Sequence, residues 1–465
     1  GADPALVAPA HGASLSAPPP RPGRLAARAR VGCAEIFSAA AAALYLAAQQ
    51  RRRRPDAAAK GEKMASIELD LAPAETCGTD YVERARALAP LLEEAADEIE
   101  ERRQLPDRVV EALIEGGFFK LLLPRSIGGA ELHPLTYVQV LEEIAKAEPS
   151  TAWSLGQNSG CSMSAPYLDP AVAREIFGPR RGILAWGPDL PGAGRGVAVE
   201  GGIRVTGRWG FATGSRHATW LGAHIPIFEE NGTPRMNPNG RPFVRTVLFP
   251  KTSAEIIDNW QVIGLRGTGS DSYAVEDLFV PQKYTCSRDN QAERREPGLL
   301  YKFTSGMIYA MGFSNVSLGI ARGALEAFIV LARDKIPRGA RNPLRQNNVI
   351  QSQVAQCEAR LRSSRAFIRA TLDEMWEAAE RTGDFLPEQH PRLRLASTWA
   401  IQQARDVVAA VYSAAGATAI FTENPFERRL RDIHAGTQQG QGRPVHFETV
   451  GQILLGLPPE GRMFR

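Results

Sequence analysis

The order of sequence patterns along this chain of 465 residues restricts the folds that it can adopt. Within residues 78–160, apolar side chains such as Leu88 and Leu92 recur three or four positions apart, which is the spacing of one helix face. From residue 182, short β-rich runs alternate with turn clusters, and from about Tyr301 long alanine- and arginine-rich segments follow. This order predicts a helical domain, a small β-domain and a second helical domain.

Turn and breaker residues set the expected boundaries of these elements. Pro106-Asp107 suits the start of a helix that Gly116 closes, and Gly201-Gly202 marks a hairpin turn. Several short strands of this kind are typical of a small barrel or sandwich. The predicted strands cover residues 182–186, 196–199, 203–206, 220–228, 244–249, 260–263 and 273–280, and the predicted long C-terminal helices cover residues 303–334, 346–381 and 391–417.

Composition excludes several classes of protein. Apolar residues make up 44% and charged residues 23%, which is ordinary for a soluble globular enzyme. The net charge of +4 is small, so we expect neither nucleic acid nor a membrane as a partner. The five cysteines are scattered without a C-x-x-C pair, and the seven histidines form no H-x-x-x-H pair. We therefore expect a reducing compartment, without a disulfide framework or a metal site.

Residues 1–63 differ from the rest of the chain. They are rich in alanine, proline and arginine, and their apolar stretch at 36–48 is shorter than the roughly 20 residues that span a bilayer. A basic region before a short apolar run is typical of an export signal, and arginine-rich, acid-poor sequence is typical of a transit peptide. However, Met64 opens a sequence of normal enzyme composition. We interpret 1–63 as a disordered or non-native leader and expect a cytoplasmic protein.

A glycine-rich run at residues 263–270 is the strongest candidate for ligand binding. Its three glycines let the backbone approach a ligand closely while neighbouring donors point at it. The spacing G-x-x-G-x-G, followed by a strand, is not a dinucleotide fingerprint. The alternative is a polar turn before an edge strand. The run interleaves Gly264, Gly267 and Gly269 with Arg266, Thr268 and Ser270.

A second candidate is the segment 209–214, which reads Trp-Gly-Phe-Ala-Thr-Gly. A flavin needs a flat apolar neighbour, and a hydroxyl group near its N5 atom can stabilise one redox form. Phe211 and Thr213 would supply these two groups. The alternative is that Phe211 belongs to the core and Thr213 is a surface residue of a strand.

Both segments resemble those of the acyl-CoA dehydrogenase fold, and the resemblance covers residues 78–465. In that family a Gly-Leu-Arg-Gly loop lies against the flavin, and a Trp-x-Thr strand packs an aromatic ring on it. The implied α+β fold has an N-terminal helical domain (64–181), a central β-barrel or sandwich (182–290) and a C-terminal four-helix bundle (291–465). The implied flavin-binding residues are Trp209, Phe211, Thr213, Gly214, Arg266 and Ser270.

Two parts of the chain distinguish the monooxygenases of this fold from its true dehydrogenases. Residues 207–220 and 150–154 are similar to those of two-component flavin-dependent monooxygenases, which makes Trp153 a substrate-binding candidate. True dehydrogenases carry a Thr-Glu-Pro-Gly-x-Gly-Ser-Asp segment before the Trp-x-Thr strand. Here residues 186–194 lack its acidic and serine portion.

The catalytic base of a dehydrogenase is also missing. Such enzymes remove the proton alpha to a thioester with a glutamate, usually in a Tyr-Glu-Gly-Thr segment of the last domain. In the matching stretch, 431–441, two alignments put Ala435 or Gly440 at that position, and residues 303–322 hold no acid. Because neither residue accepts a proton, the dehydrogenase hypothesis is weakened.

His434 stands in this stretch instead. In the monooxygenases that it resembles, a histidine here supports a C4a-hydroperoxyflavin or deprotonates a phenol, and imidazole suits both tasks. Many relatives have another histidine five residues on, where this chain has Gln439, so the role of His434 stays open. A helix cap or a buried structural histidine is the alternative. With Thr213, His434 is the catalytic candidate; weaker ones are His217 and His224, and weaker still His11, His133, His390 and His446.

The motifs that hold the ADP half of FAD in dehydrogenases are degraded here, at residues 341–345 and 413–416. Arg341 or Arg345 could still pair with a phosphate. The resemblance therefore implies reduced FMN or loosely held reduced FAD as cofactor, with O2. The chain has no NAD(P)H fingerprint, and this lack implies that a separate NAD(P)H:flavin reductase supplies the reduced flavin. The implied assembly is a homotetramer formed through the C-terminal bundle.

These inferences predict the oxygenase component of a two-component monooxygenase that hydroxylates a small aromatic or heteroaromatic substrate. The run at 443–451 is most similar to indole-3-acetate-type oxygenases, and the subfamily includes 4-hydroxyphenylacetate hydroxylases. One alternative is an acyl-CoA dehydrogenase whose base is not yet placed. The other is a flavin-binding or scaffold protein without catalysis.

Overall fold

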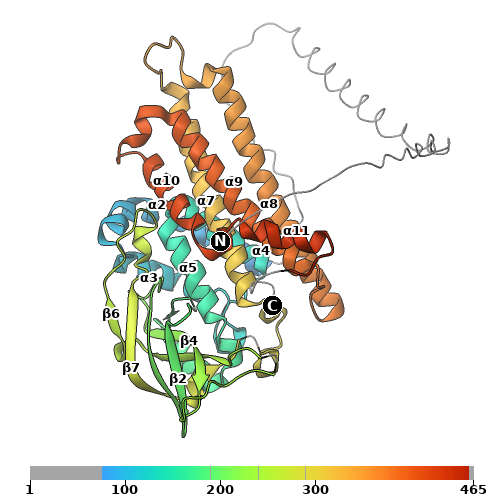
Figure 1. The fold of residues 1–465 in the computed structure, drawn as a ribbon. Coiled ribbons are helices and arrows are strands. Elements are labelled where there is room, and N and C mark those ends of the chain that lie inside the picture. Colours follow the sequence, from blue (N-terminus) through green and yellow to red (C-terminus); the bar gives the residue numbers. More distant parts are fainter. Residues whose placement is uncertain (1–75, 189, 239, 289, 460–465) are drawn as a thin grey trace, which may run out of the picture. The chain divides into compact units, whose positions relative to one another are not determined.

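The computed structural model describes residues 76–459, except 189, 239 and 289. The leader predicted at 1–63 and its boundary at Met64 lie outside the described residues. The described elements follow the predicted order of helices, strands and helices, which is confirmed (Figure 1).

The N-terminal helices begin and end where the sequence signals predict. α3 starts directly after Pro106 and ends at Gly116, and α4 ends two residues before Pro149, which opens α5. The Glu148 carboxylate caps α5 by accepting the N–H groups of Ser150 and Thr151. The helices are α2 (Thr76–Arg102), α3 (Asp107–Glu115), α4 (Pro134–Ala147), α5 (Pro149–Ser162) and α6 (Pro170–Phe177).

The described strands form one eight-stranded sheet in the order β6-β7-β3-β2-β4-β5-β8, with β1 paired to β4. The hairpin predicted at Gly201-Gly202 joins β2 to β3. The strands are β1 (Leu184–Ala185), β2 (Gly194–Val199), β3 (Gly202–Trp209), β4 (Trp220–Phe228), β5 (Val244–Pro250), β6 (Glu255–Ile257), β7 (Ser272–Pro281) and β8 (Thr285–Cys286).

The sheet bends around a buried aromatic core. Tyr273 of β7 donates its hydroxyl hydrogen to the carbonyl of Gly222 in β4, although these two strands are not neighbours in the sheet. Trp209 stacks on the Tyr273 ring at a centroid distance of 5.4 Å, and Phe249 lies at 6.4 Å from it. The predicted barrel or sandwich is therefore a single curved sheet that encloses these rings.

The strand predicted at 260–263 is wrong, and β6 lies five residues earlier. The N–H groups of Asn259 and Trp260 donate to the Asp271 carboxylate, at 3.3 and 3.2 Å. The Trp260 indole donates to the carbonyl of Leu265 at 3.2 Å. Because a side chain takes the N–H groups that a ladder would need, this segment forms a loop beside the glycine-rich run.

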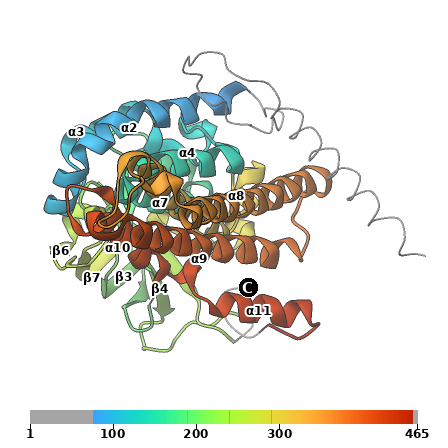
Figure 2. The same ribbon diagram turned by 90° about the horizontal axis from the view of Figure 1, so that it is seen from above.

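The C-terminal helices pack around α7. The three long helices begin within two residues of their predicted starts, and α10 and α11 lie in the predicted C-terminal helical domain, outside the three predicted ranges. α7 contacts α4, α5 and α9, and α8 runs beside α9 (Figure 2). The helices are α7 (Ser305–Asp334), α8 (Asn348–Thr382), α9 (Gln389–Ala415), α10 (Pro425–Thr437) and α11 (Val445–Leu454).

α7 is the core helix of this region. By length and composition alone it could cross a membrane, and among the described helices only α7 meets that test. However, 61% of its most apolar window is buried in the protein, so its apolar side chains serve the core. At Gly319, α7 passes so close to α4 that a Cβ atom would overlap the Glu142 carbonyl and lie 2.6 Å from the Ala145 Cβ.

This close approach predicts that Gly319→Ala destabilises the protein, although alanine is the better helix former by up to about 1 kcal/mol. Overpacking at a buried contact typically costs about 1–3 kcal/mol, and we expect a loss in that range in urea unfolding. The matched control is Gly451→Ala in α11, where a Cβ would meet nothing within 4 Å. It should lose no stability. Equal stability of the two variants would contradict the close packing of α4 and α7.

Candidate active site

Two segments that are far apart in the sequence meet through a row of hydroxyl groups. The Thr213 Oγ1 atom lies 2.6 Å from the Ser270 Oγ atom, which lies 2.8 Å from the Thr268 Oγ1 atom. The N–H group of Gly214 donates to the Thr268 carbonyl at 3.2 Å. All three hydroxyl groups are buried, and Thr213 is only 5% exposed. Thr213 is therefore not the surface residue of the alternative interpretation.

Phe211 lies two residues after the end of β3, and the residue is 59% exposed. Its φ of +57° is a left-handed conformation that is strained for a bulky residue. The ring meets the Trp260 ring edge to face, at a centroid distance of 5.9 Å. Ile263, the first residue of the glycine-rich run, is also exposed. Phe211 is thus not a core residue, and it offers a flat apolar face beside the buried hydroxyl row. Strain of this kind is typical of functional sites.

Trp209, the last residue of β3, lies in the core of the sheet beside these groups. It is 1% exposed, it stacks on Tyr273, and its indole N–H has no hydrogen-bond partner among the described residues. Its position in the sheet core supports Phe211, two residues further on, and its contact with a flavin stays a prediction.

The glycine-rich run is fastened to α10. The N–H group of Leu265 donates to the Asp432 carboxylate at 2.6 Å, and the Arg431 guanidinium donates to the Ile263 carbonyl at 2.6 Å. A side chain on Gly264 would overlap the carbonyl of Arg431. Arg431 and Asp432 were not among the candidate site residues of the sequence analysis. The structure gives them a positioning role that no spacing in the sequence indicated.

Burial raises the pKa of Asp432 to about 7, and the nearby Glu148 and Glu100 carboxylates act in the same direction. The hydrogen bond from Leu265 opposes this shift. Arg266, the charged residue of the run, is partly exposed, and its Nε atom lies 3.8 Å from Glu100. Arg266 thus keeps donors that are available to a ligand.

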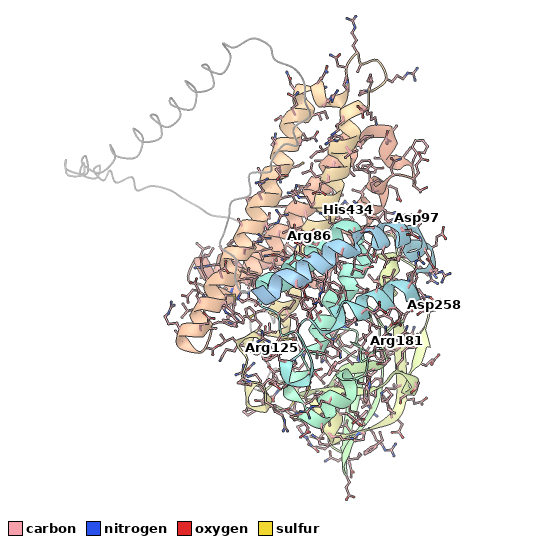
Figure 3. All side chains as sticks on the ribbon, turned by 180° about the vertical axis from the view of Figure 1, so that it is seen from behind. Arg86, Asp97, Arg125, Arg181, Asp258 and His434 are labelled. Atoms are coloured by element: carbon pink, nitrogen blue, oxygen red, sulfur yellow. The ribbon has the colours of Figure 1, made fainter. Side chains whose placement is uncertain are left out.

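His434 does not join this cluster. It lies on α10 two positions from both Asp432 and Gly436, which is about 200° around the helix. Asp432 faces the glycine-rich run, and a Cβ on Gly436 would lie 3.4 Å from the Trp153 ring, whereas His434 is exposed. Figure 3 labels His434 among the helices, away from the label of Asp258 at the sheet. Its catalytic role stays a prediction.

Trp153 lies between α10 and α7. Its ring stacks on Phe313 at a centroid distance of 4.1 Å, and Phe313 stacks on Tyr309 at 5.7 Å. The Leu265 side chain is also close, since a Cβ on Gly436 would lie 4.0 Å from it. An aromatic stack therefore begins beside the glycine-rich run, which suits binding of an aromatic molecule.

The other candidate histidines have structural partners. His217 bonds to Asn158 at 3.1 Å and His224 to Thr246 at 2.8 Å, and burial lowers the pKa of both histidines to about 3. Among the described residues, no three His, Cys, Asp or Glu side chains are placed to hold a metal ion. His133 caps α4, burial lowers the pKa of His390 and His446, and His11 lies outside the described residues.

The pKa of Asp432 predicts a pH-dependent stability. An unfolded aspartate titrates near pH 4, so between about pH 4 and 7 the folded state binds more protons and stability falls as the pH rises. Asp432→Asn keeps an acceptor for Leu265 but removes this titration. From pH 5 to 8, the unfolding free energy of the wild type should fall by on the order of 1–3 kcal/mol relative to the variant. Parallel pH profiles in chemical denaturation would contradict this.

Comparison with family models agrees with the helical regions. Residues 82–169 match the acyl-CoA dehydrogenase N-terminal domain, and residues 311–440 match the acyl-CoA dehydrogenase C-terminal domain.

Known proteins extend the likeness across the sheet. The indole-3-acetate monooxygenase of Pseudomonas putida is 30% identical over 366 residues, covering 78% of this chain and 90% of its own length. The oxygenase subunit HsaA of a flavin-dependent monooxygenase from Rhodococcus jostii is 28% identical and covers 81% and 98%. The 3-HSA hydroxylase from Rhodococcus sp. RHA1 superposes with a TM-score of 0.75 at 26% identity, over 83% of this chain and 99% of that one. The chain therefore belongs to the flavin-dependent monooxygenases of the acyl-CoA dehydrogenase fold.

Proposed function

We propose that the chain is the oxygenase component of a two-component monooxygenase. It would take reduced flavin from a separate NAD(P)H:flavin reductase and use O2 to hydroxylate an aromatic or heteroaromatic substrate. Relatives named oxygenase subunit or oxygenase component support the separate reductase. Bound reduced flavin would supply the electrons and the oxygen-activating chemistry.

The residues around Phe211 fit a flavin ring. The exposed Phe211 face would pack on the ring, and the buried Thr213 hydroxyl would bond to its edge. Ser270 and Thr268 orient that hydroxyl, and Arg266 would pair with the ring edge or with a phosphate. This pairing of an exposed aromatic face with a buried hydroxyl row is the observation that carries the proposal.

The aromatic stack that starts at Trp153 would hold the substrate ring. Rings stacked in parallel offer a face to another flat molecule and exclude water from the reacting atoms. His434, which is exposed on α10, would contribute a proton acceptor.

We propose FMN or loosely held FAD as the cofactor. One solved relative from Streptomyces holds FADH2, and another, KijD3, holds FMN; at 23% and 18% identity they show the fold alone. Arg341 and Arg345 are exposed in the connection after α7, where either could pair with a phosphate.

We also propose a cytoplasmic homotetramer. Large apolar side chains are exposed on the C-terminal helices and the segments that connect them, and apolar surface of this kind is typical of subunit contacts. The three cysteines whose pairing the structure describes, Cys161, Cys286 and Cys357, are buried free thiols, which suits a reducing compartment. The exposed apolar residues are Val330, Val349, Trp399, Ile420 and Phe421.

An acyl-CoA dehydrogenase is less well supported. Of residues 431–441, only Asp432 carries a carboxyl group, and that group is buried against the N–H of Leu265. It is therefore committed to holding the glycine-rich run.

The proposal is tested by mixing the protein, loaded anaerobically with reduced FMN or FAD, with oxygenated buffer and an aromatic substrate. We expect hydroxylated product in a substantial ratio to hydrogen peroxide. Recovery of all electrons as peroxide with every aromatic substrate would contradict the proposal, and reduction of bound FAD by an acyl-CoA would favour the dehydrogenase.

Thr213→Val should leave the fold intact and lower the yield of product per flavin oxidised. Loss of one hydrogen bond is worth about 0.5–1.5 kcal/mol, so we expect a decrease of roughly 2- to 10-fold, with a matching rise in peroxide. Thr449→Val in α11 removes a hydroxyl whose one hydrogen bond among the described residues goes to the Val445 carbonyl, and it should change neither quantity. An unchanged product yield in Thr213→Val would argue against a flavin contact.

Phe211→Gly should weaken flavin binding and not weaken the fold. Glycine adopts the left-handed conformation without the penalty of roughly 1 kcal/mol that other residues incur. We therefore expect a melting temperature equal to or above that of the wild type, and a Kd for reduced flavin raised at least several-fold. Asp277→Gly relieves a similar φ of +46° on β7 and should leave flavin binding unchanged. Equal flavin affinity in both variants would contradict the role of Phe211.

A further inference from the structure

We propose that the first turn of α7, with Arg288 and Arg394, binds the carboxylate of the substrate, so that the substrate class is an aromatic carboxylate. This inference rests on the proposed function and narrows it. Three independent features of the described residues meet at this turn.

The first feature is Arg288, in the segment after β8. Its guanidinium donates to the carbonyl of Gly160 at 3.1 Å and to the hydroxyl of Ser305, and it lies over the Trp186 ring at 4.7 Å. Within the described part of the chain these partners are a carbonyl, a hydroxyl and an indole, and none is a carboxylate. A half-buried guanidinium without a counter-charge is ready to pair with an anion.

The second feature is Arg394 on α9. It is only 7% exposed, and its Nη1 atom has no hydrogen-bond partner among the described residues. Its Nη2 atom lies 3.5 Å from the position that a Cβ on Gly306 would take. Burial lowers its pKa to about 10. A buried charge without a partner is costly, so its presence beside this turn needs an explanation that an anionic ligand supplies.

The third feature is the helix end itself. Ser305 and Gly306 are the first two residues of a helix of 30 residues, and their N–H groups have no carbonyl partner within it. Among the described N–H groups, the Thr304 side chain accepts that of Met307 alone, at 3.4 Å. The helix dipole adds positive potential at this end. Arg288 bonds to Ser305, and the Arg394 guanidinium lies on the side of Gly306 where a Cβ would point.

Aromatic rings extend from this turn toward the flavin site. Ser305, Tyr309 and Phe313 are spaced four residues apart and so lie on one face of α7. Tyr309 is roughly 6 Å along the axis from Ser305, which one or two carbons between a ring and a carboxylate would cover. From Phe313 the stack continues to Trp153, beside Gly436 of α10. A substrate with its acid at the turn would thus direct its ring toward the site of Phe211 and Thr213.

The flavin phosphate is a second anion that this turn could bind. The test therefore compares substrates and flavins that differ only in charge. In the full chain, Arg288→Met and Arg394→Met are compared with wild type by calorimetry. The ligands are indole-3-acetate and 4-hydroxyphenylacetate, each with its uncharged amide, and oxidised FMN with riboflavin.

We expect the wild type to bind at least one acid more tightly than its amide. In each variant, the Kd of that acid should rise by roughly 10- to 100-fold and the Kd of its amide by less than about threefold. The Kd of FMN should not change. Arg394→Met should also melt at or above the wild-type temperature, because it removes a buried unpaired charge. The matched control, Arg392→Met, removes an exposed arginine of α9 that pairs with Glu374, and it should leave both ligands unchanged.

Several results would overturn the inference. Equal weakening of acid and amide, or no preference for the acid in the wild type, would exclude carboxylate recognition here. If the arginine variants bind FMN less tightly but riboflavin as tightly as the wild type does, the turn binds the flavin phosphate. If the wild type prefers amides or binds neither class but hydroxylates an uncharged phenol, the monooxygenase proposal stands and this inference fails. If an acid is preferred but no flavin binds, the proposed function fails instead.

Discussion

The candidate active site depends on how tightly the glycine-rich run fits between three helices. A side chain on Gly264 would overlap α10 at Arg431, and one on Gly267 would overlap Ile99 of α2 and lie 3.0 Å from the Ser150 Cβ of α5. The hydrogen bond from the Leu265 N–H to the Asp432 carboxylate then fixes the position of the run along α10. Because Thr268 and Ser270 follow directly, this fit sets the position of the hydroxyl row that reaches Thr213.

An ion-pair network around the buried Asp271 continues this constraint into the sheet. Asp271 accepts a bond from the Arg216 Nε atom at 2.7 Å, and it also holds the backbone of Trp260. Asp258 accepts from Arg216 and from Arg103, which stands just after α2. Breaking one partner of such a network leaves an uncompensated charge, so it fixes geometry more than it adds stability. Phe211, which is strained and exposed, is therefore surrounded by segments that are held in one conformation.

The sequence predicted the fold well because its signals were local. Pro106, Gly116 and Pro149 act on their own backbone, and helix periodicity needs only a few turns of chain. The sequence failed at 260–263, where apolar and aromatic residues favour a strand but the Asp271 carboxylate takes the N–H groups. It also missed Arg288 and Arg394, since a lone arginine carries no pattern, and the lack of a counter-charge is visible only when all neighbours are in place.

By itself the sequence determined the order of the helices and strands, the glycines of the run and the residue types available for chemistry. Only the tertiary structure decided which of these side chains meet. Thr213 and Ser270 are 57 positions apart, and Leu265 and Asp432 are 167 apart, yet both pairs share hydrogen bonds. His434 is a neighbour of Asp432 in the sequence but points away from the run, because a helix turns about 100° per residue. Composition determines what a site can contain, whereas the rotation and path of each element determine what it does contain.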